Sequence, residues 1–132
     1  MATKIVDGGL DIVTNRISGS GTEPKYIGWG TGAGTTGVTD TTLFTEKDVD
    51  LSTGTGTRTT GTSARATTTT TNDTYRVTGT RTATGAGTVT NAGTWDNATM
   101  GSGNLFLKGD FTGISLAIGD SISFTVNAVF DN

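Results

Sequence analysis

The stretch SISFTVNAVF, residues 121–130, decides the fold class of this chain. Its apolar residues Ile122, Phe124, Val126, Ala128 and Phe130 alternate with Ser121, Ser123, Thr125 and Asn127. Successive side chains of a β-strand point to opposite faces, so this alternation predicts a strand with one buried and one solvated face. The preceding Gly119-Asp120 is a turn signal. The chain is therefore predicted to end in a half-buried strand.

Shorter stretches upstream combine apolar strand residues with glycine-rich turns. We expect strands over residues 10–17, 26–29, 75–84, 88–95 and 105–118. Residues 39–46 are the one expected helical turn, with Thr39 as N-cap and Leu43 and Phe44 on its apolar side. Several short strands separated by such turns predict an all-β fold, an antiparallel β-sandwich of jelly-roll or immunoglobulin-like type. One domain is expected over residues 1–132, with at most one short helical turn.

The composition fits a β-protein that binds rather than catalyses. Thirty-two of the 132 residues are threonine and 21 are glycine, whereas histidine and cysteine are absent. Threonine favours strands, and glycine favours the turns between them. The chain therefore lacks the commonest general base, the thiol nucleophile and the usual transition-metal ligands. We expect no enzymatic activity, no cofactor and no metal site.

Charge and hydropathy exclude two further classes of partner. The net charge is −3 and basic residues are scattered from Lys4 to Lys108, which argues against nucleic-acid binding. No apolar run approaches the roughly 18 residues of a membrane span, and the start of the chain does not resemble a signal peptide. We therefore expect synthesis in the cytoplasm and no membrane partner.

Residues 51–71 form a tract in which threonine and glycine roughly alternate. Neither face of such a strand is apolar, so the tract is expected to be an extended, solvated ribbon that ends at Asn72-Asp73. A strand without a core face can find partners on neighbouring chains by strand addition. The candidate partner-binding residues in it are Thr57, Thr59, Thr67 and Thr69.

Aromatic residues supply the other candidates. Trp29, Trp95 and Tyr75 can stack on a sugar or anchor a protein partner, although core packing is the more frequent fate of such residues. All three therefore enter the list of candidate partner-binding residues, with a core role as the alternative.

Three patterns suggest chemistry but fit it poorly. The glycines of residues 28–34 resemble a nucleotide-binding loop, yet no substantial helix follows, so a flexible surface loop is the preferred interpretation. Asp96, Asp110 and Asp120 lie near turns rather than in apolar surroundings, which disfavours a glycosidase pair. Asp48-Val49-Asp50 and Asp96-Asn97 are the only hints of a calcium site.

Two groups of segments resemble virion proteins of tailed bacteriophages. The first is KYIGWGTG, residues 25–32, followed by TDTTLFTE, residues 39–46. The second is TVTNAGTWD, residues 88–96, followed by LFL, residues 105–107, and GDSISFTV, residues 119–126. Over half of the chain is covered. Asn91 departs from the glutamate of the phage pattern, and Thr94-Trp95 replaces its Leu-Phe.

The resemblance implies a structural protein of the virion with no catalytic residue carried over. A capsid decoration (cement) protein is expected, which would bind the major capsid protein as a homo-oligomer, most often a trimer. Its place would be the capsid surface, after synthesis in the host cytoplasm. The alternative is a tail or fibre component that binds host-surface glycans through Trp29, Trp95 and Tyr75.

Overall fold

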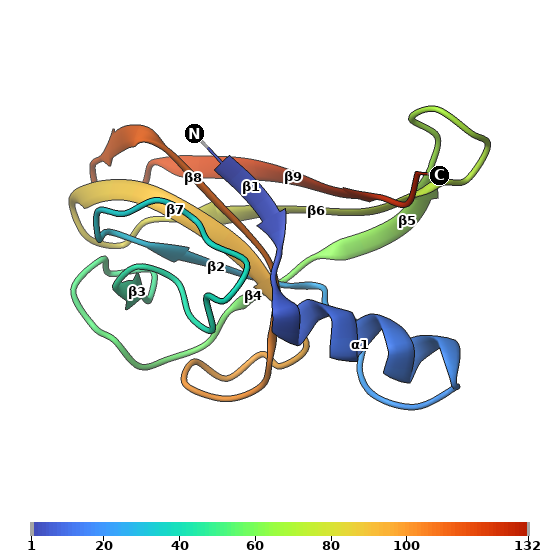
Figure 1. The fold of residues 1–132 in the computed structure, drawn as a ribbon. Helices are drawn as coiled ribbons and strands as arrows, with labels where there is room; N and C mark the ends of the chain where they lie inside the picture. The colour runs from blue at the N-terminus through green and yellow to red at the C-terminus, as the bar shows by residue number, and fades with distance from the viewer. Residues whose placement is uncertain (1, 132) are drawn as a thin grey trace.

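The computed structural model describes residues 2–131 and confirms the all-β sandwich (Figure 1). A large six-stranded sheet runs in the order β1-β8-β7-β2-β3, with β4 also pairing to β2. Its strands are β1 (Ala2–Ile5), β2 (Tyr26–Gly30), β3 (Glu46–Lys47), β4 (Thr59–Thr60), β7 (Gly87–Trp95) and β8 (Leu105–Leu116). A small sheet contains β5 (Thr62–Ala66), β6 (Thr74–Thr82) and β9 (Ser121–Val129) in the order β5-β6-β9. All of these pairings are antiparallel.

The C-terminal strand has the predicted alternation. Ile122, Phe124, Val126 and Ala128 face inward on β9 and are buried or half-buried, whereas the residues between them are exposed. The whole of β9 pairs with β6, from Ser121 opposite Thr82 to Val129 opposite Thr74. The binary pattern therefore fixed both the strand and the face that it buries.

The strand expected over residues 10–17 is wrong, because this segment is the helix α1 (Asp7–Ile17). Its Ile12 is buried against β8, and Gly9 lies so close to that strand that a Cβ there would overlap the Phe106 carbonyl oxygen. Asp7 in the first turn and Arg16 in the last complement the helix dipole. Packing on the sheet thus outweighs the strand preference of the β-branched residues.

The helical turn expected at residues 39–46 is also wrong. This segment consists of turns and bends that lead into β3, and it lies against the large sheet. The glycines of residues 28–34 do not form a flexible surface loop. Gly28 and Gly30 are buried in β2, and a Cβ at Gly34 would lie 2.7 Å from the Phe44 ring. These glycines make room for the side chains of the segment that covers the sheet.

The tract of residues 51–71 is not one solvated ribbon. It is irregular at first and then contributes β4 and β5 to different sheets. Leu51 and Arg58 are buried, so the tract does have residues that face the core. Residues 52–57 and the part that follows β5 are exposed loops.

Three apolar clusters form the core. The cluster around Trp29, with Val89 and Leu116, packs against Phe124 of the small sheet. A second cluster joins α1 to β8 and β9, and a third lies around Trp95 and Leu43. Among residues 2–131, no helix has the length and apolar character that crossing a membrane requires.

Candidate functional site

Three buried cations hold one acidic segment, residues 40–48, against the sandwich. They come from three different parts of the chain, and each forms an ion pair with a different acid of this segment. The pairs are Lys108 with Asp40 at 2.9 Å, Arg58 with Glu46 at 2.7 Å, and Arg81 with Asp48 at 3.2 Å. The cationic side chains are almost completely buried, whereas the acids are partly exposed.

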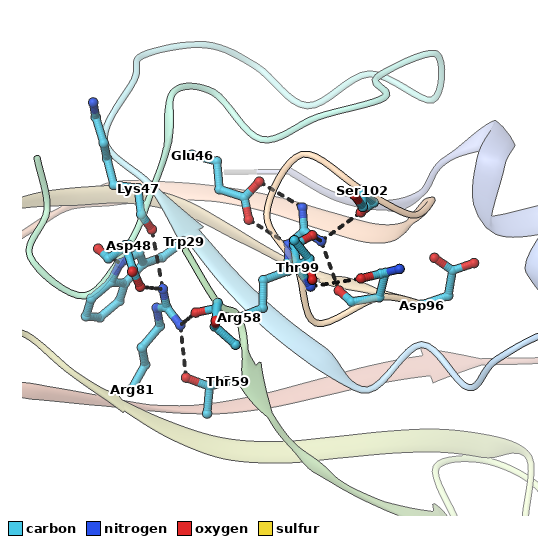
Figure 2. Close-up of polar contacts among 12 residues, drawn as sticks. Trp29, Glu46, Lys47, Asp48, Arg58, Thr59, Arg81, Asp96, Thr99 and Ser102 are labelled. Carbon is cyan, nitrogen blue, oxygen red and sulfur yellow. Dashed lines mark hydrogen bonds and ion pairs between the residues drawn. The ribbon is translucent and has the colours of Figure 1, made fainter. Parts of the chain in front are cut away.

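Arg58 is the most extensively bonded of the three (Figure 2). Its Nε and Nη2 donate to the two carboxylate oxygens of Glu46 at 2.7 and 3.0 Å. Its Nη1 donates to the carbonyl oxygens of Asn97, Thr99 and Ser102 at 2.8–2.9 Å. The guanidinium carbon also lies 3.7 Å from the centre of the Trp95 ring. One side chain therefore ties the acidic segment to the loop between β7 and β8.

Arg81 makes a similar but looser arrangement beside Trp29, as Figure 2 shows. Its Nη1 donates to the Thr59 hydroxyl and the Thr57 carbonyl oxygen, and its Nη2 donates to Asp48. Burial lowers the pKa of the Arg81 guanidinium, and the charge of Asp48 opposes that shift. The Trp29 indole N–H donates to the Asp48 carbonyl oxygen at 3.1 Å.

Lys108 holds the start of the acidic segment. Its ammonium donates to Asp40 and to the Thr42 carbonyl oxygen, both at 2.9 Å, and lies 3.2 Å from the centre of the Phe44 ring. The hydrogen bond from Lys108 is the main reason that the pKa of Asp40 is lowered. Next to it, Asn91 exchanges hydrogen bonds with the backbone N–H and carbonyl of Phe44. The buried polar groups of Lys108 and Asn91 thus form hydrogen bonds with the acidic segment in place of water.

Sequence reasoning missed these three cations because it treated all basic residues as surface charges. Arg81 carried a usable signal, since it shares the parity of the inward-facing Tyr75 and Val77 on β6. Lys108 also carried a signal, because it directly follows the buried run Leu105–Leu107 in the same strand. Arg58 carried none, because the tract around it has no apolar periodicity.

The acids considered for chemistry have structural contacts. Asp96, Asp110 and Asp120 each accept a backbone N–H, from Asn104, Thr36 and Ala117 respectively. Asp48 binds Arg81, and Asp50 accepts from the backbone N–H groups of Ser52 and Thr53. Residues 2–131 contain no group of three or more potential ligands placed to hold a metal ion.

The two tryptophans proposed to bind a partner lie in the core. Trp29 is 0% and Trp95 3% exposed, so neither ring is open to a sugar or to another protein. Thr57 and Thr59 lie next to them, where both bind Arg81. The structure thus brings these four residues close together and gives them intramolecular partners, with both indoles buried, Thr59 half-buried and Thr57 exposed.

The other predicted residues lie elsewhere, near the start of β6. Thr67 and Thr69 belong to an exposed loop that projects beyond β5 and β6 in Figure 1. Asp73 orders this loop, because its carboxylate accepts the backbone N–H groups of Thr68, Thr69 and Thr70. These bonds lower the pKa of Asp73.

Tyr75 lines an apolar groove of about 480 Å³ between α1 and the small sheet. Ile12, Val13, Ile17 and Phe130 line it with Tyr75. The Tyr75 hydroxyl donates to Glu23 at 3.1 Å, and burial together with this carboxylate raises the pKa of the phenol. The groove is therefore mainly apolar, with the Tyr75–Glu23 pair and the charged Arg16 also in its lining.

Exposed apolar side chains gather at two places. The α1 patch consists of Leu10, Ile17 and Phe130, which are 58%, 81% and 51% exposed. Ile17 and Phe130 line the groove, and Leu10 lies about two helical turns before Ile17 on α1. The turn patch consists of Ile114 and Ile118, at the end of β8 and in the turn to β9. In Figure 1 this turn lies at the opposite end of β9 from the C terminus. Clusters of exposed apolar side chains occur at contact surfaces, whereas single ones are common on any protein surface.

Comparisons of the chain with protein-family models, with curated proteins and with solved structures found no match.

Proposed function

We propose that this protein is a phage capsid decoration protein that binds the major capsid protein and stabilises the shell without catalysis. Decoration of this kind requires each copy to contact more than one neighbouring subunit. A ligand that binds only the assembled shell stabilises that shell by mass action. The resemblance to virion proteins further suggests a homo-oligomer, expected to be a trimer, on the capsid surface.

The observation that carries the proposal is the separation of the α1 patch from the turn patch. A protein that bridges two shell subunits needs two contact surfaces that face different neighbours. Ile17 at one end and Ile118 at the other are the most exposed apolar residues of their patches. Their separation by the length of β9 suits a bridging subunit (Figure 1).

The segments that carry the phage resemblance are neighbours in space, which supports treating them as one pattern. β2 of the first group pairs with β7 of the second, with Gly30 opposite Asn91. Asn91 also binds the backbone of Phe44 in the acidic segment. Asn91, one of the residues that depart from the phage pattern, thus lies at the contact between the two groups.

Two experiments on the virion test the proposal. Cryo-EM and quantitative mass spectrometry of purified particles should place the chain on the shell, in multiples of three at each capsomer junction. A few copies at a single vertex would indicate a tail component instead, and absence from the shell would refute the proposal. A glycan array then tests the tail alternative, whose stacking platform is weakened by the burial of Trp29 and Trp95.

The two patches can be tested separately by co-sedimentation with shells that lack the protein. Ile17→Asp and Ile118→Asp should each weaken shell binding by at least about tenfold, which is the loss of roughly one buried aliphatic contact. Val38→Asp is the matched control, since Val38 is 47% exposed but belongs to neither patch. Equal binding by all three variants would contradict the assignment of the patches.

A further inference from the structure

β9 is an edge strand that lacks the usual features that prevent pairing with other chains. Its nine residues, SISFTVNAV, include no charge, no proline and no glycine, and β9 is the last strand of the small sheet. Other edge strands of the described chain are shorter or charged: β5 has five residues with Arg65, and β1 has four with Lys4. Proteins normally protect long edges because the free backbone groups pair with other chains.

The direction of the free backbone groups follows from two hydrogen bonds that flank the β6–β9 ladder. The Phe130 N–H donates to the Asp73 carbonyl at 2.9 Å, and the Ala83 N–H donates to the Asp120 carbonyl at 2.7 Å. In an antiparallel pair, every second residue directs both backbone groups to the same neighbour. The even-numbered residues of β9 therefore face β6, and the odd-numbered ones direct their N–H and C=O groups away from the sheet. These are Ser121, Ser123, Thr125, Asn127 and Val129.

The inner face of β9 is also incompletely covered. Ile122, Phe124 and Val126 point toward the core but are only half-buried, because their strand has a neighbour on one side only. Val129 and Phe130 at its end are exposed. One more strand along this edge would satisfy the outward backbone groups and bury part of this apolar row together.

We propose that this strand is β9 of a second copy, paired antiparallel about a two-fold axis at Thr125. Such pairing aligns residues whose numbers add to 250. The odd-numbered residues, which are polar except for Val129, therefore lie opposite odd-numbered residues of the partner, and the inward-facing even-numbered residues lie opposite even-numbered ones. Thr125 lies opposite the partner's Thr125, and Phe124 lies opposite the partner's Val126.

Charge agrees with a second copy as the occupant. The pairing places the flanking Asp120 opposite the partner's Phe130 and Asp131 opposite the partner's Gly119, so no like charges meet across the axis. The result is one continuous six-stranded sheet, built from two three-stranded sheets. The inference does not depend on the proposed function, because it rests on the edge alone.

A charge-swap experiment tests the axis directly. Thr125→Lys and Thr125→Glu each place two like charges opposite one another in a homodimer, whereas a mixture of the two variants pairs opposite charges. Thr125 is exposed on the outer face, so neither substitution disturbs the core. Thr78→Lys is the matched control, because Thr78 is exposed and directly opposite Thr125 but lies on the central strand β6.

Sedimentation at about 10 to 500 μM spans the affinities expected of a strand-edge contact. The wild type should have the mass of an even number of subunits, either a dimer or a pair of trimers. Each Thr125 variant should halve that mass, the mixture should restore it, and Thr78→Lys should leave it unchanged. In the wild type, amide exchange at Ser123, Thr125 and Asn127 should slow with concentration.

Three results would overturn the proposal. The first is a wild-type mass that corresponds to an odd number of subunits at every concentration. The second is an unchanged mass in both Thr125 variants, and the third is a mixture that fails to restore the mass lost in the single variants. Pairing of the β9 edge with a different protein would appear as the first result.

Discussion

Replacing Arg58 by alanine tests whether the buried cations hold the acidic segment in place. The substitution removes both hydrogen bonds to Glu46 and all three to the carbonyl oxygens of Asn97, Thr99 and Ser102. It also removes the stacking on Trp95. The acid and the carbonyl groups lose their donor together, and a cavity remains beside the indole.

The expected cost is large. Breaking a buried ion pair by removing one partner costs about 3–5 kcal/mol. Glu46 is 13% exposed and can recover some hydration, which lowers the cost, whereas the unpaired carbonyls and the lost cation–π contact raise it. We expect a loss of about 4 kcal/mol in the free energy of unfolding. At about 4 °C per kcal/mol for a chain of this size, Tm should fall by about 15 °C.

Urea unfolding followed by tryptophan fluorescence measures this cost, since both indoles lie beside the two buried arginines. Arg58→Lys keeps the charge but not the bidentate hydrogen bonding to Glu46, so the free energy of unfolding should fall by roughly half as much. Arg65→Ala on the exposed side of β5 is the control and should change stability by no more than about 0.5 kcal/mol. A loss below about 1 kcal/mol for Arg58→Ala would refute the reasoning.

Three further predictions concern other contacts. Because the pKa of Asp40 is below its ordinary value of 3.8, its ion pair stabilises the fold above that pH and is lost as the pH falls, so Asp40→Asn should flatten the acid limb of a stability–pH curve. Asp73→Ala should speed amide exchange of residues 68–70 by at least about tenfold, measured by NMR, with the rest of the chain unchanged. Gly30→Ala should cost about 1–3 kcal/mol in thermal unfolding because its Cβ overlaps the Phe44 carbonyl, whereas Gly37→Ala, with ordinary contacts, should be nearly neutral.

Strand prediction succeeded where a segment buries one face. β9 and its preceding turn, β2, β7 and most of β8 were predicted from local pattern, because alternation and glycine turns report directly on which face is buried. β6 was predicted at nearly its observed bounds, as a strand over residues 75–84 where the structure has Thr74–Thr82. These elements suffice to define an all-β sandwich.

The helix α1 could not be predicted with the same rule. Gly8-Gly9 and the β-branched Ile12 and Val13 favour a strand or a break when judged locally. Only contact with β8 makes Gly9 favourable, since the helix backbone approaches Phe106 there. Asp7, Arg16 and Gly19, which has a positive φ, are signals of helix ends. In the prediction from sequence, the strand preference of the β-branched residues outweighed them.

Local sequence by itself determined that this chain is a β-protein and which face of its last strand lies inside, because period-two patterning acts within a strand. Only the tertiary structure decided where the charges go. Lys108, Arg58 and Arg81 meet Asp40, Glu46 and Asp48 across separations of 68, 12 and 33 residues. Burying a charge is favourable only when a partner arrives from elsewhere in the fold. Strand parity could place Arg81 on the inner face, but no local pattern identifies the acid with which it pairs.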